Sequence, residues 1–374
     1  MRNILRNLGN LIAAVLLSTA AVFSILMIVR PILFDRVLER LPVLLKERDL
    51  RSREEASGTP NDSLRALSQS MAGIFKKRLS GWYPLALAEA GALALTSDGW
   101  FLAPEGNWSG DVLIVRNEIY SIERIVRDEN TGLNFLKVNG SRFKSAEFTS
   151  STNRLPGTPI ALVSAEQIVS TSLSGYLMPE IASAPLTALR RRFLVAGDAR
   201  IPGTAVADIS GKVIAIISER PADDQTAVGA VKALKGFSNA VPSDNFRFAL
   251  RRLIENGFVA HHELLAEGVE LAHYHSAGSN KMALSGTLIN ALSNDSPLIA
   301  ADLKPADIIL AVDKEVIQEG RTFSEIIEAI EPGRTLTLDI LRAGDTFRTS
   351  LTLPEFSENN VSNGKIKSQS KLSR

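Results

Sequence analysis

The pattern of apolar and polar positions changes along the chain, and its first feature is a long uncharged run. Residues 11–29, LIAAVLLSTAAVFSILMIV, are 19 consecutive positions without a charge. About 20 apolar residues cross a bilayer as a helix. The apolar core of a cleaved signal peptide is usually shorter, roughly 7–15 residues. We therefore predict an uncleaved transmembrane helix within residues 1–33, with a cleaved signal peptide and a buried globular helix as the alternatives.

Residues 34–63 show a helical pattern that ends in turn-forming residues. Phe34, Val37, Leu38 and Leu41 recur at helical spacing, as on one face of an amphipathic helix. The letters ASGTPNDS at 56–63 are typical of a linker. We expect an amphipathic stalk that lies on the membrane or pairs with a copy of itself. A solvated helix with one buried stripe is the alternative.

Residues 64–260 contain short apolar runs separated by turn signals. The runs lie at 92–95, 112–115, 133–138, 160–163 and 213–217. Regularly spaced short strands are typical of a β-barrel or sandwich. A helical pattern with Phe246, Leu250 and Leu253 follows and stops at Asn256-Gly257, a helix C-cap signal. This region is therefore predicted to be mainly β and closed by one helix.

A second β pattern occupies residues 261–355. Candidate strands lie at 286–292, 335–341 and 346–353. Between them, one face of a predicted helix at 323–330 carries Phe323, Ile326, Ile327 and Ile330. The tail at 356–374 is rich in Ser, Asn and Lys, a composition that predicts disorder.

Composition and charge narrow the chemistry. The chain has 42 Lys and Arg residues against 41 Asp and Glu residues, a net charge of +1. So small a net charge does not favour binding to nucleic acid. Cysteine is absent, which excludes disulfides, thiolate catalysis and cysteine-ligated metals. The four histidines are His261, His262, His273 and His275. No carboxylate or cysteine completes a clear metal spacing around them, so we expect surface or hinge histidines and neither metal nor cofactor.

Four segments of the middle region carry a resemblance to a known family. They read TSDGWFL at 96–102, RDENTGLNFLKV at 127–138, DISGKVIAI at 208–216 and AVPS at 240–243. In order and spacing they resemble the trypsin-like domain of HtrA-family serine proteases. The resemblance implies a double β-barrel, and in that family a serine, histidine and aspartate that hydrolyse peptides.

The positions that the resemblance assigns to catalysis carry unsuitable residues. The histidine position falls at Gly106, the aspartate position at Gly132 and, counting back from Gly211, the nucleophile at Pro202. Proline has no hydroxyl and no backbone N–H, so it supplies neither nucleophile nor oxyanion donor. No histidine occurs between residues 1 and 260. We predict no catalytic residues at these positions and a degenerate trypsin-like domain over residues 64–260.

An active enzyme that uses a catalytic arrangement other than the Ser-His-Asp triad is an alternative. Thr204 would serve as a nucleophile only with another base. Ser141 and Lys144 have the S-x-x-K spacing of a Ser–Lys pair, but this four-residue pattern is common by chance. An active serine-type endopeptidase therefore stays the second reading.

The longest motif lies in the C-terminal region. The letters SPLIAADLKPADIILAVD at 296–313 follow S-P-A-x-x-A-G-L-K-P-G-D-x-I-L-x-[VI]-[DN] almost throughout. Together with GTLINAL at 286–292 they resemble the PDZ domain that follows HtrA protease domains. Asp302 and Ala306 replace two glycines of that pattern. Because alanine tolerates left-handed backbone poorly, we expect an altered turn at Ala306.

The PDZ resemblance implies a groove that binds an extended peptide as an added strand. The family's carboxylate-binding loop, roughly [YW]-[IL]-G-[VI], corresponds here to Ala266, Glu267, Gly268 and Val269. The opposite wall would be the helix with Phe323, Ile326, Ile327 and Ile330. Glu267 replaces an apolar residue and would repel a ligand carboxylate if it pointed toward it. We expect peptide or protein C-termini as ligands, with a purely structural PDZ domain as the alternative.

The whole layout resembles the membrane-tethered HtrA proteins of bacterial envelope stress. That resemblance implies a single-pass inner-membrane protein with a periplasmic or extracytoplasmic bulk, often a trimer. Arg and Lys after the apolar run favour the opposite orientation, but long domains translocate largely regardless of charge. We expect an anchored pseudoprotease that binds peptides or scaffolds a partner in envelope protein quality control. A structural subunit of an active HtrA-like protease is a further alternative.

Overall fold

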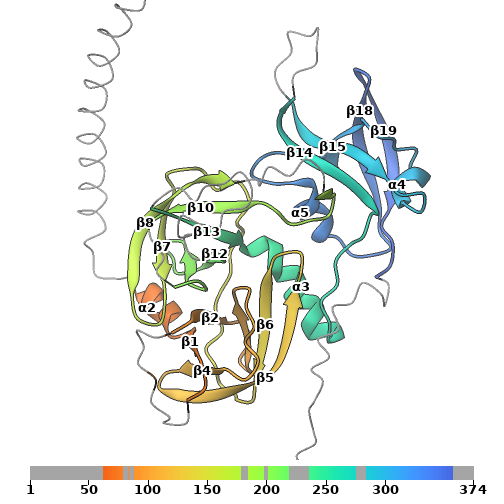
Figure 1. Cartoon of the computed structure of the whole chain (residues 1–374). Coiled ribbons are helices and arrows are strands. Elements are labelled where there is room, and N and C mark those ends of the chain that lie inside the picture. The colour runs from red at the N-terminus through yellow and green to blue at the C-terminus, as the bar shows by residue number, and fades with distance from the viewer. Residues whose placement is uncertain are drawn as a thin grey trace, which may run out of the picture. The chain divides into compact units, whose positions relative to one another are not determined.

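The computed structural model describes residues 62–78, 83, 88–177, 184–197, 201–218, 236–274 and 284–356 (Figure 1). The chain divides into two compact units, Met1–Thr59 and Pro60–Arg374. The predicted membrane helix, nearly all of the predicted stalk and linker, and the tail after Phe356 lie outside the described residues. Among the helices that are described, none combines the length and the apolar character needed to cross a membrane.

Six of the described strands close into a first barrel. Around the barrel they are β1 (Met71–Phe75), β2 (Ala90–Ala94), β3 (Trp100–Ala103), β6 (Leu133–Val138), β5 (Glu118–Asp128) and β4 (Val112–Val115). Strands β1, β2 and β3 are buried along their whole length. Strand β5 alternates more exposed with less exposed residues over most of its length, the pattern of a strand with one face toward a core.

A second closed barrel follows in the chain. Around it run β10 (Arg192–Ala196), β13 (Phe237–Pro242), β12 (Val213–Ile217), β11 (Ala205–Ala207), β7 (Pro159–Val163) and β8 (Ile168–Leu177). The short helix α2 (Asp62–Ser68) precedes both barrels, and α3 (Ser243–Asn256) follows them (Figure 1). One buried cluster contains Leu93 and Phe135 of the first barrel, Val163 and Ile216 of the second, and Phe246 of α3. The two barrels and α3 therefore share a core.

Helix α3 is fixed at both ends. At its C-terminus Gly257 adopts the left-handed conformation, with φ = 81°, and donates its N–H to the Leu253 carbonyl, as the sequence predicted. In its first turn the Asp244 carboxylate accepts hydrogen bonds from the Ser151 N–H at 2.8 Å and the Ser150 hydroxyl at 2.9 Å. Although burial opposes the charge, these bonds hold the pKa of Asp244 below its usual value. The helix is thereby tied to the loop before β7.

The C-terminal region forms an antiparallel sheet of seven strands among the described residues. Its order is β19 (Asp345–Thr352), β18 (Thr335–Arg342), β16 (Ile308–Val312), β15 (Leu284–Leu292), β14 (Ala266–Tyr274) and β9 (Ala184–Pro185), with β17 (Glu315–Val316) paired to β16. Helices α4 (Pro297–Ala300) and α5 (Phe323–Glu328) accompany it. Strand β9 comes from the middle of the chain, before β10, so this sheet includes a segment from the region predicted as trypsin-like.

The two residues that stand where the PDZ pattern has glycines both adopt a left-handed backbone conformation. Asp302 has φ = 58° and Ala306 has φ = 74°, a region that glycine enters easily and alanine does not. The Ala306 N–H still donates to the Ile289 carbonyl at 2.8 Å. Ala306 therefore holds a left-handed conformation that alanine disfavours, and the expected alteration of this turn stays a prediction.

Candidate functional site

The position predicted to have lost the catalytic histidine lies beneath a tryptophan. The Trp108 indole N–H donates to the Pro104 carbonyl at 3.0 Å, and Asn134 of β6 donates to the carbonyls of Pro104 and Gly106 at 3.1 Å each. A Cβ atom added at Gly106 would overlap the Trp108 ring. Glycine is thus required here by packing, and the loop has no room for a larger side chain without moving Trp108.

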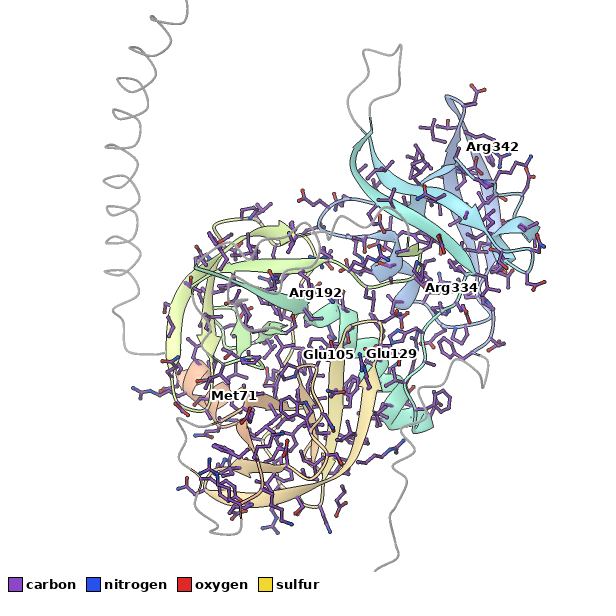
Figure 2. All side chains as sticks on the ribbon, in the orientation of Figure 1. Met71, Glu105, Glu129, Arg192, Arg334 and Arg342 are labelled. Atoms are coloured by element: carbon purple, nitrogen blue, oxygen red, sulfur yellow. The ribbon has the colours of Figure 1, made fainter. Side chains whose placement is uncertain are left out.

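The position predicted to have lost the aspartate is close to that loop. Gly132 has φ = 72°, and a Cβ added to it would lie 3.7 Å from the Glu105 carboxylate. Glu105, labelled at this end of the first barrel in Figure 2, forms an ion pair with Arg127 of β5. The structure therefore brings the loop at 105–106 and the turn at Gly132 together. It places an exposed ion pair beside them.

The turn predicted to have lost the nucleophile is packed backbone to backbone. The Gly91 N–H of β2 donates to the Pro202 carbonyl at 2.7 Å, and the Gly203 N–H donates to the Ile217 carbonyl at 2.7 Å. Gly203 has φ = 86°, and a Cβ there would overlap the carbonyl of Gly91. The N–H after Pro202 is therefore committed to β12, and Pro202 itself has none to offer an oxyanion.

The hydroxyls considered as alternative nucleophiles have other partners. Thr204 donates its hydroxyl to the Ile201 carbonyl at 2.7 Å. Ser141 and Lys144 are both exposed, and the Lys144 ammonium donates to the Gln69 side chain at 3.4 Å. None of these contacts joins a hydroxyl to a base, the arrangement that activates a nucleophile.

The predicted peptide-binding residues divide into a buried group and an exposed edge. Ala266 of β14 and the α5 face come together in one apolar cluster: Ala266, Phe323, Ile326 and Ile327 are buried in it, and Ile330 packs against it. Glu267 is exposed and Val269 is half-buried outside this cluster. Gly268 is buried, and a Cβ there would overlap both the Leu288 carbonyl of β15 and the side chain of Leu186.

Two further residues of this cluster were not predicted from the sequence. Leu264, just before β14, and Leu186, just after β9, are both buried in it. The apolar character of Leu264 two residues before the predicted loop is a weak signal that could have found it. Leu186 lies 80 residues before Ala266 and belongs to no recognised pattern, so only the folded chain identifies it.

A buried carboxylate also lies between β14 and α5. Glu270 accepts hydrogen bonds from the Thr287 hydroxyl at 2.6 Å and from the Phe323 N–H at 3.2 Å. Burial, with a smaller contribution from the nearby negative charge of Glu325, raises the pKa of Glu270 to about 7. This carboxylate accepts a hydrogen bond at the start of α5, the helix predicted to form the opposite wall of the peptide groove.

The connection between α3 and β14 carries a buried network of charges. His261 Nε2 lies 2.7 Å from the Asp128 carboxylate, and its Nδ1 lies 3.0 Å from the Glu328 carboxylate. Arg252 of α3 forms an ion pair with Glu328 as well. Although burial opposes the charge, these two carboxylates raise the pKa of His261 to about 10. A carboxylate close to each ring nitrogen favours the charged imidazolium, so two cations balance two carboxylates here.

The second histidine of the pair is buried in a different environment. His262 Nε2 lies 2.8 Å from the Ile330 carbonyl, and its ring stacks near Phe356, over which Arg252 also lies. Burial lowers the pKa of His262. Neither His261 nor His262 is a surface residue, so the surface alternative is wrong for both, and the hinge alternative stays a prediction. In the described part of the chain, no group of three or more candidate ligands is arranged to hold a metal ion.

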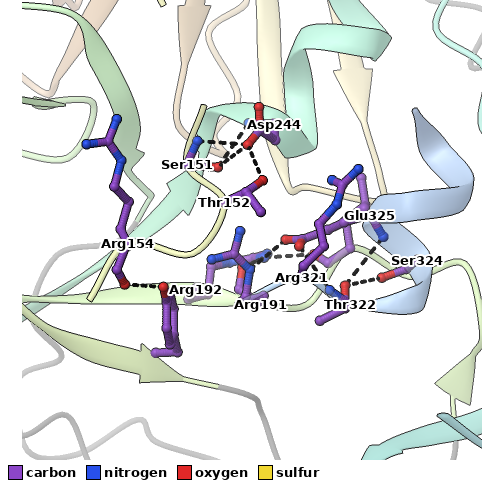
Figure 3. A network of polar contacts seen from close by, with 12 residues as sticks. Ser151, Thr152, Arg154, Arg191, Arg192, Asp244, Arg321, Thr322, Ser324 and Glu325 are labelled. Carbon is purple, nitrogen blue, oxygen red and sulfur yellow. Dashed lines mark hydrogen bonds and ion pairs between the residues drawn. The ribbon is translucent and has the colours of Figure 1, made fainter. Parts of the chain in front are cut away.

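A second buried ion pair joins the segment before β10 to α5 (Figure 3). Arg191 Nε donates to the Glu325 carboxylate at 2.8 Å, with side chains 0% and 1% exposed. Glu325 also closes a capping box with Thr322, which holds the first turn of α5. The Arg191 guanidinium lies over the rings of Tyr176 and Phe193. One residue of α5 thus both caps its helix and pairs with the residue just before β10.

Two closed barrels, a closing helix and a PDZ-like sheet are the arrangement of a trypsin-like domain followed by a PDZ domain, and they resemble HtrA-type proteases as the sequence indicated. Residues 268–353 match the family model of the PDZ domain. The chain is 27% identical to the serine endoprotease DegS of Escherichia coli over 127 residues, which is 34% of this chain and 36% of DegS. It is 26% identical to the periplasmic serine endoprotease DegP of Escherichia coli over 164 residues, 44% of this chain and 33% of DegP. The matched part thus spans about a third of these relatives.

Solved structures agree on the fold over most of the chain. The HtrA-type protease AlgW with a tripeptide has a TM-score of 0.55 and 18% identity, covering 79% of this chain and 97% of AlgW. The same protease with a decapeptide has a TM-score of 0.52 and 15% identity, covering 80% of this chain and 99% of AlgW. At this identity the likeness concerns the fold alone.

Proposed function

We propose that this chain is a membrane-anchored pseudoprotease of the HtrA type that binds peptide segments, or scaffolds a partner protein, through its PDZ domain. The observation that carries the proposal is a contrast. The turn at Pro202 offers neither a nucleophile nor an oxyanion donor, whereas the buried residues of the groove between β14 and α5 are in place. We assign residues 64–260 to a degenerate trypsin-like domain and 261–355 to the PDZ domain.

The loss of hydrolysis follows from the groups that acyl transfer needs. A serine-type mechanism requires a nucleophile, a base within hydrogen-bonding reach and N–H donors for the oxyanion. The chain has no histidine before His261. His261 lies between Asp128 and Glu328 with its pKa raised to about 10, so at neutral pH it is a charged structural cation and not a proton acceptor.

Peptide binding is supported by the groove itself. Strand β14 lies at the edge of the strands that form the PDZ domain, and an extended peptide binds such an edge as an added strand. The buried apolar cluster beside it, with Ala266, Phe323 and Ile327, suits an aliphatic side chain. The two AlgW structures hold a tripeptide and a decapeptide, and we extend peptide binding from that protein to this one.

Membrane anchoring rests on residues 11–29, and the compartment on the relatives. We propose that this apolar run is a single-pass inner-membrane helix and that residues 64–355 lie on the periplasmic or extracytoplasmic side. DegP is named a periplasmic protease. A homotrimer, or an assembly with an active HtrA-like protease, would place several PDZ domains at the membrane for protein quality control.

The full chain, purified in detergent micelles, tests the proposal with two readouts on one sample. A fluorophosphonate probe and unfolded casein report hydrolysis, with an active HtrA-type protease as the positive control. A library of peptides with free C-termini, each matched by its C-terminal amide, reports binding. We expect no labelling, no casein turnover and binding that weakens at least tenfold on amidation. Serine-specific labelling that disappears when one serine is changed would establish the active endopeptidase instead.

A further inference from the structure

The edge of the peptide groove is paired with a segment of the same chain. Strand β9 runs antiparallel to β14, with Ala184 opposite Gly268 and Pro185 opposite Glu267. The Leu186 N–H then donates to the Ala266 carbonyl at 2.9 Å. An external peptide that adds to β14 as a strand would need these same backbone groups of Ala266 and its neighbours. Strand β9 and an external peptide therefore cannot occupy this edge together.

The side chain of Leu186 fills the apolar end of the groove. It is 4% exposed and belongs to the same buried cluster as Leu264, Phe323 and Ile327. A Cβ atom at Gly268 would overlap Leu186, so β14 approaches this leucine as closely as its backbone allows. Leu186 therefore sits where the last side chain of a bound peptide would sit, beside the predicted carboxylate-binding loop.

Proline is compatible with this pairing only in one register. The Leu186–Ala266 hydrogen bond makes that pair a hydrogen-bonded one, so Pro185 and Glu267 form the neighbouring non-hydrogen-bonded pair. At such a position the backbone N–H points away from the partner strand, and the missing N–H of proline breaks no ladder bond. The local sequence Ala-Pro-Leu is therefore suited to an edge strand that stops after a few residues.

The segment is also held on its far side. Thr187 accepts a hydrogen bond from the Asn130 side chain at 3.4 Å, and Arg191 forms its buried ion pair with Glu325 of α5. The residues that follow β9 therefore contact the first barrel and the groove helix before the chain enters β10.

We propose that Ala184–Leu186 is an intramolecular ligand of the PDZ groove, and that a peptide ending in leucine or another aliphatic residue binds only by displacing it. This inference rests on the proposed peptide-binding function and adds its regulation and its ligand class. The aliphatic preference follows from the buried apolar side chains that share a cluster with Leu186, among them Leu264, Phe323 and Ile327.

The first test removes the internal ligand. The probe is a fluorescent decapeptide with the chain's own sequence, LMPEIASAPL (residues 177–186), and a free C-terminus. We expect the full-length Leu186→Asp variant to bind it at least tenfold more tightly than the wild type, because an aspartate cannot occupy the apolar cluster. The matched control is Leu155→Asp, at a leucine that is 72% exposed, which should bind as the wild type does. Equal affinity of wild type and Leu186→Asp would overturn the competition.

The second test detects the docked segment without any peptide. Because the chain has no cysteine, the double variant Pro185→Cys/Glu267→Cys contains a single pair of thiols at directly opposite positions. Non-hydrogen-bonded antiparallel pairs have Cα atoms about 4.5 Å apart, within the range for a disulfide. Mild oxidation should cross-link this variant completely, and reduction should restore peptide binding. In the control Pro185→Cys/Ala291→Cys the thiols lie about two strand spacings apart, roughly 9–10 Å, and should stay reduced.

The two tests separate the inference from the function on which it rests. No cross-link in Pro185→Cys/Glu267→Cys would overturn the docking of the segment, whatever binds the groove. A complete cross-link with equal peptide affinity in the oxidised and reduced protein would overturn the competition. A complete cross-link with no binding of any free-carboxylate peptide to Leu186→Asp would overturn the proposed peptide-binding function while leaving the docking intact.

Discussion

The turn around Pro202 and the predicted groove between β14 and α5 differ in what occupies them. In the turn, backbone groups bond to one another, and an added Cβ at Gly203 would overlap the carbonyl of Gly91. At the predicted groove, the apolar side chains are buried, and strand β9 of the same chain pairs with the edge strand β14. The turn is filled by backbone atoms, whereas the groove is filled by the side chain of Leu186, which we propose a peptide displaces.

That difference bears on how each region would respond to change. A backbone contact between two glycines cannot open without moving β2 or β12, which belong to barrels that share a core. A two-residue edge strand holding one leucine involves few hydrogen bonds, and such elements are drawn from the low-stability end of a fold. A nucleophile and an oxyanion donor would thus be hard to restore at the turn. Peptide binding in the groove would require only the release of β9.

The largest expected effect concerns the buried charge network of Asp128, Arg252, His261 and Glu328, which links α3 and the end of β5 to α5. In Glu328→Gln, Arg252 and His261 lose the carboxylate that pairs with both. Breaking a buried ion pair from one side typically costs about 3–5 kcal/mol, and we expect a loss of that size in the free energy of unfolding. Denaturant titration of the full chain measures it.

The control for that variant is Glu331→Gln, three residues later. Glu331 pairs with Arg251, and both side chains are well exposed. Exposed pairs are worth about 0–1 kcal/mol, so this variant should unfold almost as the wild type does. If both variants were equally stable, the buried network would not be what couples α3 to α5.

The next largest effect concerns the backbone contact between Gly203 and Gly91. Gly203→Ala places a Cβ against the carbonyl of Gly91 at a left-handed position. Overpacking and left-handed strain together suggest a destabilisation of about 3–4 kcal/mol. Gly110→Ala, at φ = 80° with open space around it, has the strain without the overlap and should lose only about 1–2 kcal/mol. Thermal unfolding distinguishes the two, and equal losses would contradict the backbone packing described for the turn.

A pH-dependent effect tests the wall of the groove. The pKa of Glu270 is about 7 in the folded protein, against an ordinary value of 4.5. Below pH 4.5 both folded and unfolded chains hold this proton. Between pH 4.5 and 7 the unfolded chain releases it first, so stability is lost as the pH rises through this window. By linkage the loss is roughly 3 kcal/mol.

Comparison with Glu270→Gln isolates that contribution. The free energy of unfolding of the wild type minus that of the variant should fall by roughly 3 kcal/mol between pH 4 and pH 8, and stay level at higher pH. The groups facing this carboxylate, Thr287, the Phe323 N–H, Glu325 and Arg190, are present in both proteins and largely cancel. A difference that does not change with pH would mean that burial does not raise this pKa.

The smallest expected effect concerns the turn at Ala306, which precedes β16. Ala306→Gly relieves the left-handed strain at φ = 74° and should stabilise the chain by about 0.5–1 kcal/mol, after allowing for the freer unfolded state. Ala300→Gly, in α4 at an exposed position, should instead lower stability by about 1 kcal/mol or less. Opposite signs in chemical denaturation are the expected result, and a destabilised Ala306→Gly would contradict it.

Much of the fold could be predicted because its elements have local signals. The strands at 112–115, 133–138 and 213–217 have the predicted bounds, since each is a short apolar run between turn residues. The C-cap at Gly257 and the apolar face of α5 follow from glycine conformation and helical spacing. The trypsin-like double barrel and the PDZ domain are confirmed by the strand topology and the comparisons.

What the sequence could not reveal depends on contacts between distant residues. The pairing of β9 with β14 joins residues about 80 positions apart and has no periodicity of its own. The ion pairs of His261 with Asp128 and of Arg191 with Glu325 span 133 and 134 positions. Charged residues are usually exposed, so nothing in the local sequence around Arg191 or Glu328 marks them as buried.

The pairing of Leu186 with the PDZ edge sets a concentration scale for any external ligand. A competitor on the same chain is not diluted with the protein, and its effective concentration near the groove is on the order of millimolar for short tethers. A free peptide of equal intrinsic affinity would need a similar concentration to fill half of the grooves. Rare or brief ligands would leave the groove closed, and only peptides that accumulate, or that make contacts beyond those of Ala-Pro-Leu, would open it.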